Sequence, residues 1–229
     1  MLSGIFDCVE QLAKNTSATM AKVAEISFFI FKNFHLQFHI CAINFSKFDR
    51  LAAKNLSTKT METERLILKP ITTDDAEFLF ELYNSPRFLE FIGDRNIKNI
   101  ETAAEYIEAR FLPQLERLGY GNYVIIRKSD GQKLGAVGVY EREGLDVQDI
   151  GFSFLPQFEG QGFGFEAASH LLETVFRDFK VRKISAITSK VNFASQNLIK
   201  KLGLKYIKNV LLPGDDEELL YFEMENPTL

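Results

Sequence analysis

The chain has 229 residues, of which 46% are hydrophobic and 25% charged, with a net charge of −4. This apolar content is enough for one large domain, or for one domain with an extension. The acidic balance and the lack of any Lys/Arg-rich stretch argue against general nucleic-acid binding, which requires a basic surface. We therefore expect no nucleic-acid partner.

The cysteines and the apolar segments indicate the cellular compartment in which the chain is expected. The two cysteines, Cys8 and Cys41, suggest neither a disulfide framework nor a zinc site, so a reducing compartment is expected. The Phe-rich segment 26–45 is interrupted by polar and charged residues, unlike a membrane span. The first twenty residues lack the pattern of a secretory signal. These features predict a cytoplasmic protein with no membrane partner.

Residues 1–60 differ in character from the rest of the chain. The pattern favours an amphipathic helix at 18–30, an alternating strand at 34–40 and a polar linker at 46–60. The character changes abruptly at Met61, which is either an internal residue or a start codon. We therefore divide the chain into an N-terminal extension, 1–60, which is either an appendage or a gene-model artefact, and a domain, 61–229.

The segment from Glu64 onward predicts one α/β domain. A strand ending at Pro70 precedes a capping box of Thr72 and Asp75, which begins a helix that Pro86 breaks. The segment 91–100 is expected to be a loop, and Pro113 is expected to kink or split the helix that follows it. The expected order is strand 64–71, helix to 84, helix 101–118, strands 123–127, 134–140 and 147–155, helix 165–179, strand 183–188, helix 192–202, and strands 204–211 and 219–225.

The turn between strand 147–155 and helix 165–179 carries glycine at every second position: Gly160, Gly162 and Gly164. Glycine lets the backbone approach a ligand closely because no Cβ intervenes. The first N–H groups of the following helix have no partner within the helix and lie at the positive end of its dipole. This arrangement predicts an anion site, most naturally for a phosphate or pyrophosphate.

Two common nucleotide loops do not fit this turn. A dinucleotide fingerprint requires G-x-G-x-x-G after a βαβ unit, but Phe165 stands at the third glycine position and the preceding strands read as antiparallel hairpins. A P-loop requires Lys-Ser/Thr after the glycines, and Phe163-Gly164-Phe165 supplies neither residue. A third interpretation, the pyrophosphate of coenzyme A, comes from a resemblance to a known family.

Five motifs in order support that interpretation by resemblance. They are 63–68 (T-E-R-L-I-L), 134–139 (L-G-A-V-G-V), 149–152 (D-I-G-F), 160–167 (G-Q-G-F-G-F-E-A), and 192–195 (N-F-A-S) followed by 201–204 (K-L-G-L). This series resembles the GNAT acetyltransferases, specifically the RimJ/RimL-like branch of ribosomal-protein N-acetyltransferases. The resemblance implies an α/β (α+β) GNAT fold: a mixed, mostly antiparallel central sheet flanked by helices, here with an N-terminal extension.

The resemblance also implies a reaction. Acetyl-CoA is the expected co-substrate, and a primary amine of a protein N-terminus or small molecule is expected to attack its thioester directly without a metal. Two residues depart from the superfamily pattern: Glu159 replaces a Gln or Arg at the start of the phosphate loop, and Ile199 replaces a frequent general-acid tyrosine. The second departure leaves open a catalytically silent acyl-CoA-binding module, and a nucleotide-binding regulatory module is a further alternative.

The expected cofactor contacts follow from the resemblance. Backbone N–H groups of the turn would bind the pyrophosphate, and the strand edge would pair with pantetheine. Asn192 either touches the CoA arm or merely caps its helix, for which Asn is well suited. The candidate cofactor-binding residues are Phe152, Ser153, Phe154, Gln161, Gly162, Phe163, Gly164, Phe165 and Asn192.

The catalytic candidates are Asp149 and Ser195. The attacking amine must lose a proton, and Asp149 stands where the branch has a glutamate that could accept it; a solvated charge at a strand end is the alternative. Ser195 is one candidate for the role that Ile199 leaves vacant. The acidic run 215–218 either attracts a cationic amine or is a solvated turn. We expect a monomer or a homodimer.

Overall fold

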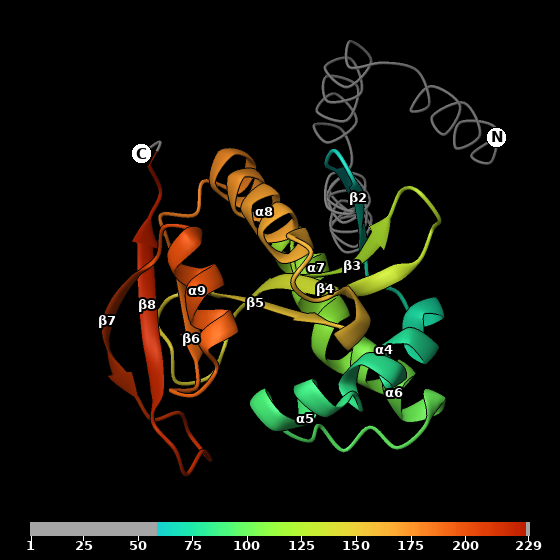
Figure 1. Cartoon of the computed structure of the whole chain (residues 1–229), viewed down its shortest axis with the longest axis horizontal. Coiled ribbons are helices and arrows are strands. Elements are labelled where there is room, and N and C mark those ends of the chain that lie inside the picture. Colours follow the sequence, from blue (N-terminus) through green and yellow to red (C-terminus); the bar gives the residue numbers. More distant parts are fainter. Residues whose placement is uncertain (1–58, 228–229) are drawn as a thin grey trace, which may run out of the picture. The chain divides into compact units, whose positions relative to one another are not determined.

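The computed structural model describes residues 59–227, which lie within one compact unit, Ala52–Leu229 (Figure 1). The expected helix 18–30 and strand 34–40 lie outside the described residues, as do both cysteines. The proposed boundary at residue 60 remains a prediction. Within the described residues, no helix is both long and apolar enough to cross a bilayer.

One eight-stranded sheet runs through this unit in the order β1-β2-β3-β4-β5-β6-β8-β7. Neighbouring strands are antiparallel except for β5 and β6, which are parallel. The mixed, mostly antiparallel sheet expected from the sequence is therefore confirmed. The strands are β1 (Met61–Glu62), β2 (Leu66–Pro70), β3 (Asn122–Arg127), β4 (Lys133–Tyr140), β5 (Asp149–Phe154), β6 (Lys183–Thr188), β7 (Lys205–Val210) and β8 (Leu219–Glu225).

Helices cover both faces of the sheet, so its central strands are apolar on both sides. Successive residues of β3 point to opposite faces: Tyr123 and Ile125 pack in the core under α8, whereas Val124 packs in the core under α4 and α6. The helices are α4 (Ala76–Tyr83), α5 (Pro86–Phe91), α6 (Ile100–Tyr106), α7 (Leu112–Leu118), α8 (Phe163–Phe179) and α9 (Phe193–Lys201). Double-sided burial explains the near-continuous apolar sequence of β4.

The local signals mostly gave the right boundaries. The capping box of Thr72 and Asp75 is present before α4. The expected helix is divided before Pro113: a π-helical segment (Ile107–Phe111) separates α6 from α7 and places the proline in the first turn of α7. The predicted helix break at Ser85-Pro86 is confirmed, but the prediction missed the helix α5, which Pro86 begins, and the short strand β1.

The strands β5 and β6 are neighbours but separate along most of their length. Their only paired residues are Asp149 and Ser185, at the start of β5. By contrast, β4 and β5 pair continuously from Gly135–Phe154 to Tyr140–Asp149. A Cβ on Gly135 would lie 2.2 Å from the carbonyl oxygen of Ser153, so this close pairing requires glycine. The sheet therefore opens into a wedge between β5 and β6.

Candidate active site

A hollow of about 570 Å³ occupies this wedge and extends beyond it. Its walls come from α5 and the segment after it, from β5 and the glycine turn, from the ends of β6 and α9, and from the loop joining β7 to β8. In Figure 1 the turn between β5 and α8 lies near the centre of the unit, with α9 to its left and α5 below it. All the candidate site residues line this hollow except Gln161.

The glycine turn has the geometry of an anion cradle. Gly160 and Gly162 have φ of +72° and +83°, in the left-handed region that favours glycine, and Gly162 is the N-cap of α8. The first backbone bond of α8 is donated by Glu166 to Gly162. Within residues 59–227, the N–H groups of 161–165 find no protein acceptor. They are therefore free to donate to a ligand at the positive end of a 17-residue helix.

An ion pair that was not predicted from the sequence stabilises this turn. The carboxylate of Glu166 accepts hydrogen bonds from the Thr63 hydroxyl at 2.6 Å, the Arg65 backbone N–H at 2.8 Å and the Arg65 Nε at 2.7 Å. Arg65 also donates to the Gln161 carbonyl oxygen at 3.2 Å. Burial alone would raise the pKa of Glu166, but these bonds hold it below its ordinary value. Thr63 and Arg65 belong to the 63–68 motif, so the motif was visible although its contacts were not.

The negative charge of Glu159 is neutralised. Its carboxylate lies 3.3 Å from Nε of Arg87 in α5, whose guanidinium also lies over the Phe91 ring. A second cation, the Lys201 ammonium, lies 4.2 Å from the centroid of the Phe165 ring beside the turn. The departure at Glu159 therefore does not leave an unbalanced negative charge next to the cradle.

Helix α9 supplies the opposite wall. The Asn192 side chain accepts from the Ser195 backbone N–H at 3.0 Å, so it caps the helix while also lining the hollow. Ser195 is half-buried, and its hydroxyl makes no hydrogen bond to any described residue. Ile199, at the expected tyrosine position, is 1% exposed and offers the hollow no proton.

Asp149 lies at the apex of the wedge and is 1% exposed. Its two oxygens accept from Nε and Nη2 of Arg142, both at 3.0 Å, and Arg142 is the second residue after β4. Burial raises the pKa of Asp149 above its ordinary value, and Arg142 only partly opposes this. A carboxylate has about four lone-pair sites, so the bidentate pair leaves it able to accept a further proton or hydrogen bond.

The comparison with known families is decisive at this point. Residues 65–205, more than half of the chain, match the family described as the acetyltransferase (GNAT) domain. The chain belongs to the GNAT acetyltransferase family. It is thus an acetyltransferase, and the donor that this family uses is acetyl-CoA.

Individual relatives agree with this assignment. The uncharacterized N-acetyltransferase YoaA of Bacillus subtilis is 27% identical over 146 residues, covering 63% of this chain and 82% of its own. The solved acetyltransferase of Agrobacterium tumefaciens has a TM-score of 0.63 at 23% identity, covering 73% of this chain and 95% of its own.

Two further solved structures share the fold at lower identity. The ribosomal-protein-S5-alanine acetyltransferase of Vibrio fischeri has a TM-score of 0.60 at 16% identity, covering 74% of this chain and 97% of its own. The spermidine N-acetyltransferase of Vibrio cholerae, solved with CoA and spermine, also has a TM-score of 0.60, at 14% identity, covering 72% and 97%. At these identities only the fold is comparable.

A polar atom without a partner supports the fit of this acetyltransferase to its donor. The Ser189 hydroxyl, just after β6, is buried and makes no hydrogen bond within residues 59–227, although Ser189 lines the hollow. A buried hydroxyl without a partner is costly, and a ligand amide or hydroxyl in the wedge would satisfy it. Ser189 was not among the residues that the sequence singled out, because a lone serine after a strand carries no distinguishing pattern.

The acidic residues 215–218 of this acetyltransferase do not all lie at the hollow. Glu218 is exposed and pairs with Lys190 at 3.0 Å, so it is engaged away from the hollow. Asp215 lines the hollow. The loop that carries it meets the loop after β4, since a Cβ on Gly144 would lie 2.5 Å from Cδ of Pro213. Only Asp215 therefore remains as a candidate contact for the acceptor amine.

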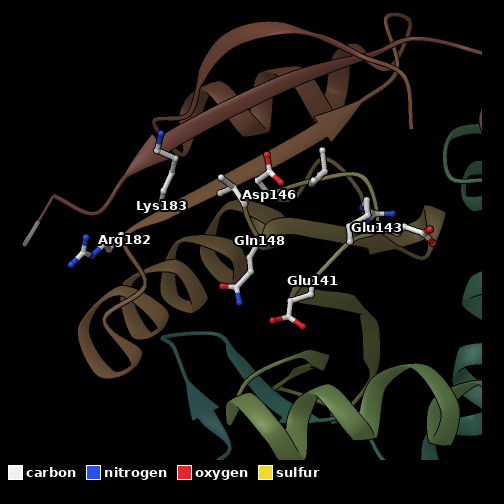
Figure 2. Close-up of a pocket in the computed structure, with 9 residues that line it drawn as sticks. Glu141, Glu143, Asp146, Gln148, Arg182 and Lys183 are labelled. Atoms are coloured by element: carbon white, nitrogen blue, oxygen red, sulfur yellow. The ribbon is translucent and has the colours of Figure 1, made fainter. Parts of the chain in front are cut away.

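A second hollow, of about 590 Å³, lies at the other end of β5, before Asp149. Figure 2 shows Arg182 and Lys183 on one side of it and Glu143 on the other. Four of its polar side chains are engaged: Glu141 with Arg117, Arg142 with Asp149, Lys183 with Glu223, and Gln148 with Tyr120. Among the described residues, no three His, Cys, Asp or Glu side chains are grouped as a metal site would require. We place the chemistry in the first hollow because it contains the cradle.

Proposed function

We propose that this acetyltransferase transfers the acetyl group of acetyl-CoA to a primary amine, by direct attack of the amine on the thioester. One observation carries the proposal: free N–H groups of the glycine turn open onto the same hollow as the buried carboxylate of Asp149. The first feature suits the CoA pyrophosphate, and the second suits an amine that must be deprotonated. The N–H groups of 161–165 bind the pyrophosphate, and 152–154 with Asn192 contact the pantetheine arm.

In this proposal Asp149 is the general base. An acceptor ammonium cannot attack until it loses a proton, which Asp149 accepts directly or through one water molecule. Its raised pKa favours this role, because a carboxylate buried in this way takes up a proton more readily than one in water. The new C–N bond forms as the C–S bond breaks, and backbone N–H groups of β5 facing the wedge stabilise the negative charge on the carbonyl oxygen. Ser195 delivers its proton to the departing thiolate and recovers one from the attacking nitrogen, which loses its second proton as the amide forms.

The acceptor is a protein N-terminus or a small-molecule amine. The motif series favours the RimJ/RimL-like branch, and a shared fold with a ribosomal-protein-S5-alanine acetyltransferase is consistent with that choice. A shared fold does not decide function, since a spermidine N-acetyltransferase shares it equally. We also propose a cytoplasmic location, a monomer or homodimer, and no requirement for a metal.

The test is thiol release from acetyl-CoA with a panel of amines that includes peptides, amino acids, polyamines and amino sugars. The full chain and a chain beginning at Met61 are compared, which also measures whether residues 1–60 matter. Amine-dependent thiol release, unchanged by a chelator, is the expected result. Saturable CoA binding without turnover of any amine would refute catalysis, and tighter binding of ATP or NAD would refute the assignment of CoA.

A further inference from the structure

The charged groups around the hollow are not equally free to meet a substrate. Two of its carboxylates already hold arginines: Asp149 holds Arg142, and Glu159 holds Arg87. At the cradle, Lys201 is stacked over the Phe165 ring. Arg95 and Asp215 also line the hollow, and no oppositely charged side chain within residues 59–227 pairs with either of them.

These two charges enter the hollow from opposite segments. Arg95 belongs to the loop between α5 and α6, and Asp215 belongs to the loop between β7 and β8. Figure 1 shows α5 and the turn joining β7 to β8 at the same lower end of the unit, away from α8. Neither Arg95 nor Asp215 belongs to the glycine turn, β5 or α9, to which the donor contacts are assigned, so we assign both charges to the acceptor side. The apolar residues that line this side are Phe88, Phe91, Ile92, Leu212 and Leu219.

We infer that the acceptor is a zwitterion: an amine whose own molecule also carries an anionic group, such as a carboxylate, on an apolar body. This rests on the proposed function. Arg95 binds the anionic group, because an arginine without a protein carboxylate presents its whole planar fork of donors to a ligand. Asp215 attracts the ammonium group toward Asp149. A polyamine is disfavoured, because it requires several free carboxylates. The buried carboxylate of Asp149 and the half-buried carboxylate of Glu159 are already paired with arginines.

Two sources share this chemistry: a free amino acid and a peptide N-terminus followed by an acidic residue. The experiment compares acceptors that differ only in the anion. Leucine is paired with 3-methylbutylamine, which lacks the carboxylate, and a C-terminally amidated peptide beginning Ser-Glu is paired with one beginning Ser-Lys. Whichever pair shows the larger preference identifies the source.

The preference is expected to be about tenfold in kcat/KM, mostly through KM, because a charge-assisted hydrogen bond at a partly exposed site has an effect of this order. It should shrink in high salt, which screens exposed charges. Arg95→Gln should reduce it to within about threefold. Lys98→Gln is the matched control, since Lys98 is an exposed cation of the same loop that does not line the hollow.

Two results would overturn the inference. If the anion-free partners are acetylated as well as the zwitterions, or if spermidine exceeds both, the acceptor class is wrong although the proposed function stands. If Arg95→Gln and Lys98→Gln reduce the preference equally, general charge and not Arg95 is responsible. No turnover with any amine would refute the proposed function itself, which is a separate failure.

Discussion

Replacing Asp149 with Asn tests the chemistry against a matched residue elsewhere in the fold. Asp149 and Asp75 are both buried carboxylates, 1% and 0% exposed, and both are ion-paired. Only Asp149 lines the hollow. Loss of a general base typically lowers the rate by about 10²–10⁴-fold, so Asp149→Asn should lower kcat by that order. Asp75→Asn should leave kcat per folded molecule unchanged.

The effects on stability should have the opposite order. Asp75 accepts from Lys69 and Lys133, both at 2.7 Å, and these bonds hold its pKa below the ordinary value despite burial. Its removal leaves two lysines without their partner and should cost about 1–3 kcal/mol. Burial leaves the pKa of Asp149 raised, so its charged form is a net burden in the folded state. Asp149→Asn, which leaves Arg142 partly exposed, should change stability by less than about 1 kcal/mol.

The assays are steady-state thiol release across pH and urea unfolding of the same preparations. In the wild type, kcat should fall as the pH drops through the raised pKa of Asp149, because the protonated form accepts no further proton. Asp149→Asn should lose this acidic limb. If Asp149→Asn keeps kcat within about threefold of the wild type with the same pH profile, the base assignment is wrong. Asp149 would then serve only to hold Arg142.

Four further predictions concern the cradle, the thiolate and the buried carboxylate. Glu159→Gln frees Arg87 and removes a negative charge about 7 Å along the chain from the first cradle N–H, so CoA should bind about threefold more tightly at low salt and less so at high salt, measured by calorimetry. Gly162→Ala should cost about 1 kcal/mol of stability and weaken CoA binding, because φ at Gly162 is +83°. Ser195→Ala should lower kcat about tenfold with CoA affinity intact; an unchanged kcat would mean that solvent protonates the thiolate. Finally, the pKa of Asp75 is lower in the folded state than in the unfolded chain, so its carboxylate stabilises the fold at pH values above its unfolded-state pKa. The stability difference between wild type and Asp75→Asn should therefore shrink as the pH falls below 3.8.

Much of the fold could be predicted because its signals are local. The glycine spacing before α8 gave the cradle, and the capping box at Thr72 gave the start of the helix that follows β2. Buried strands such as β4 were legible as apolar runs bounded by turns. These features depend on the backbone and on neighbours within a few residues, which a single sequence displays directly.

The error at Pro86 shows where local reading fails. Proline disrupts a helix interior, so it was taken as the end of a helix followed by irregular chain. Proline is equally suited to the first helical position, where its missing N–H is not needed, and Ser85 before it is a favourable cap. Both readings use the same two residues. Tertiary packing decides between them. Phe88 packs into the core with α4, where its side chain is only 5% exposed.

This error falls on the part of the site that selects the acceptor. The donor end depends on backbone N–H groups, whose placement a glycine pattern reveals. The acceptor end depends on side chains such as Arg87 and Arg95, which come from α5 and its following loop. Whether each arginine is free to bind a substrate depends on which carboxylates pair with it. Glu159 pairs with Arg87 across 72 residues of sequence, and no carboxylate within residues 59–227 pairs with Arg95. A sequence shows the charges but not their pairing, so it can identify the donor long before it can identify the acceptor.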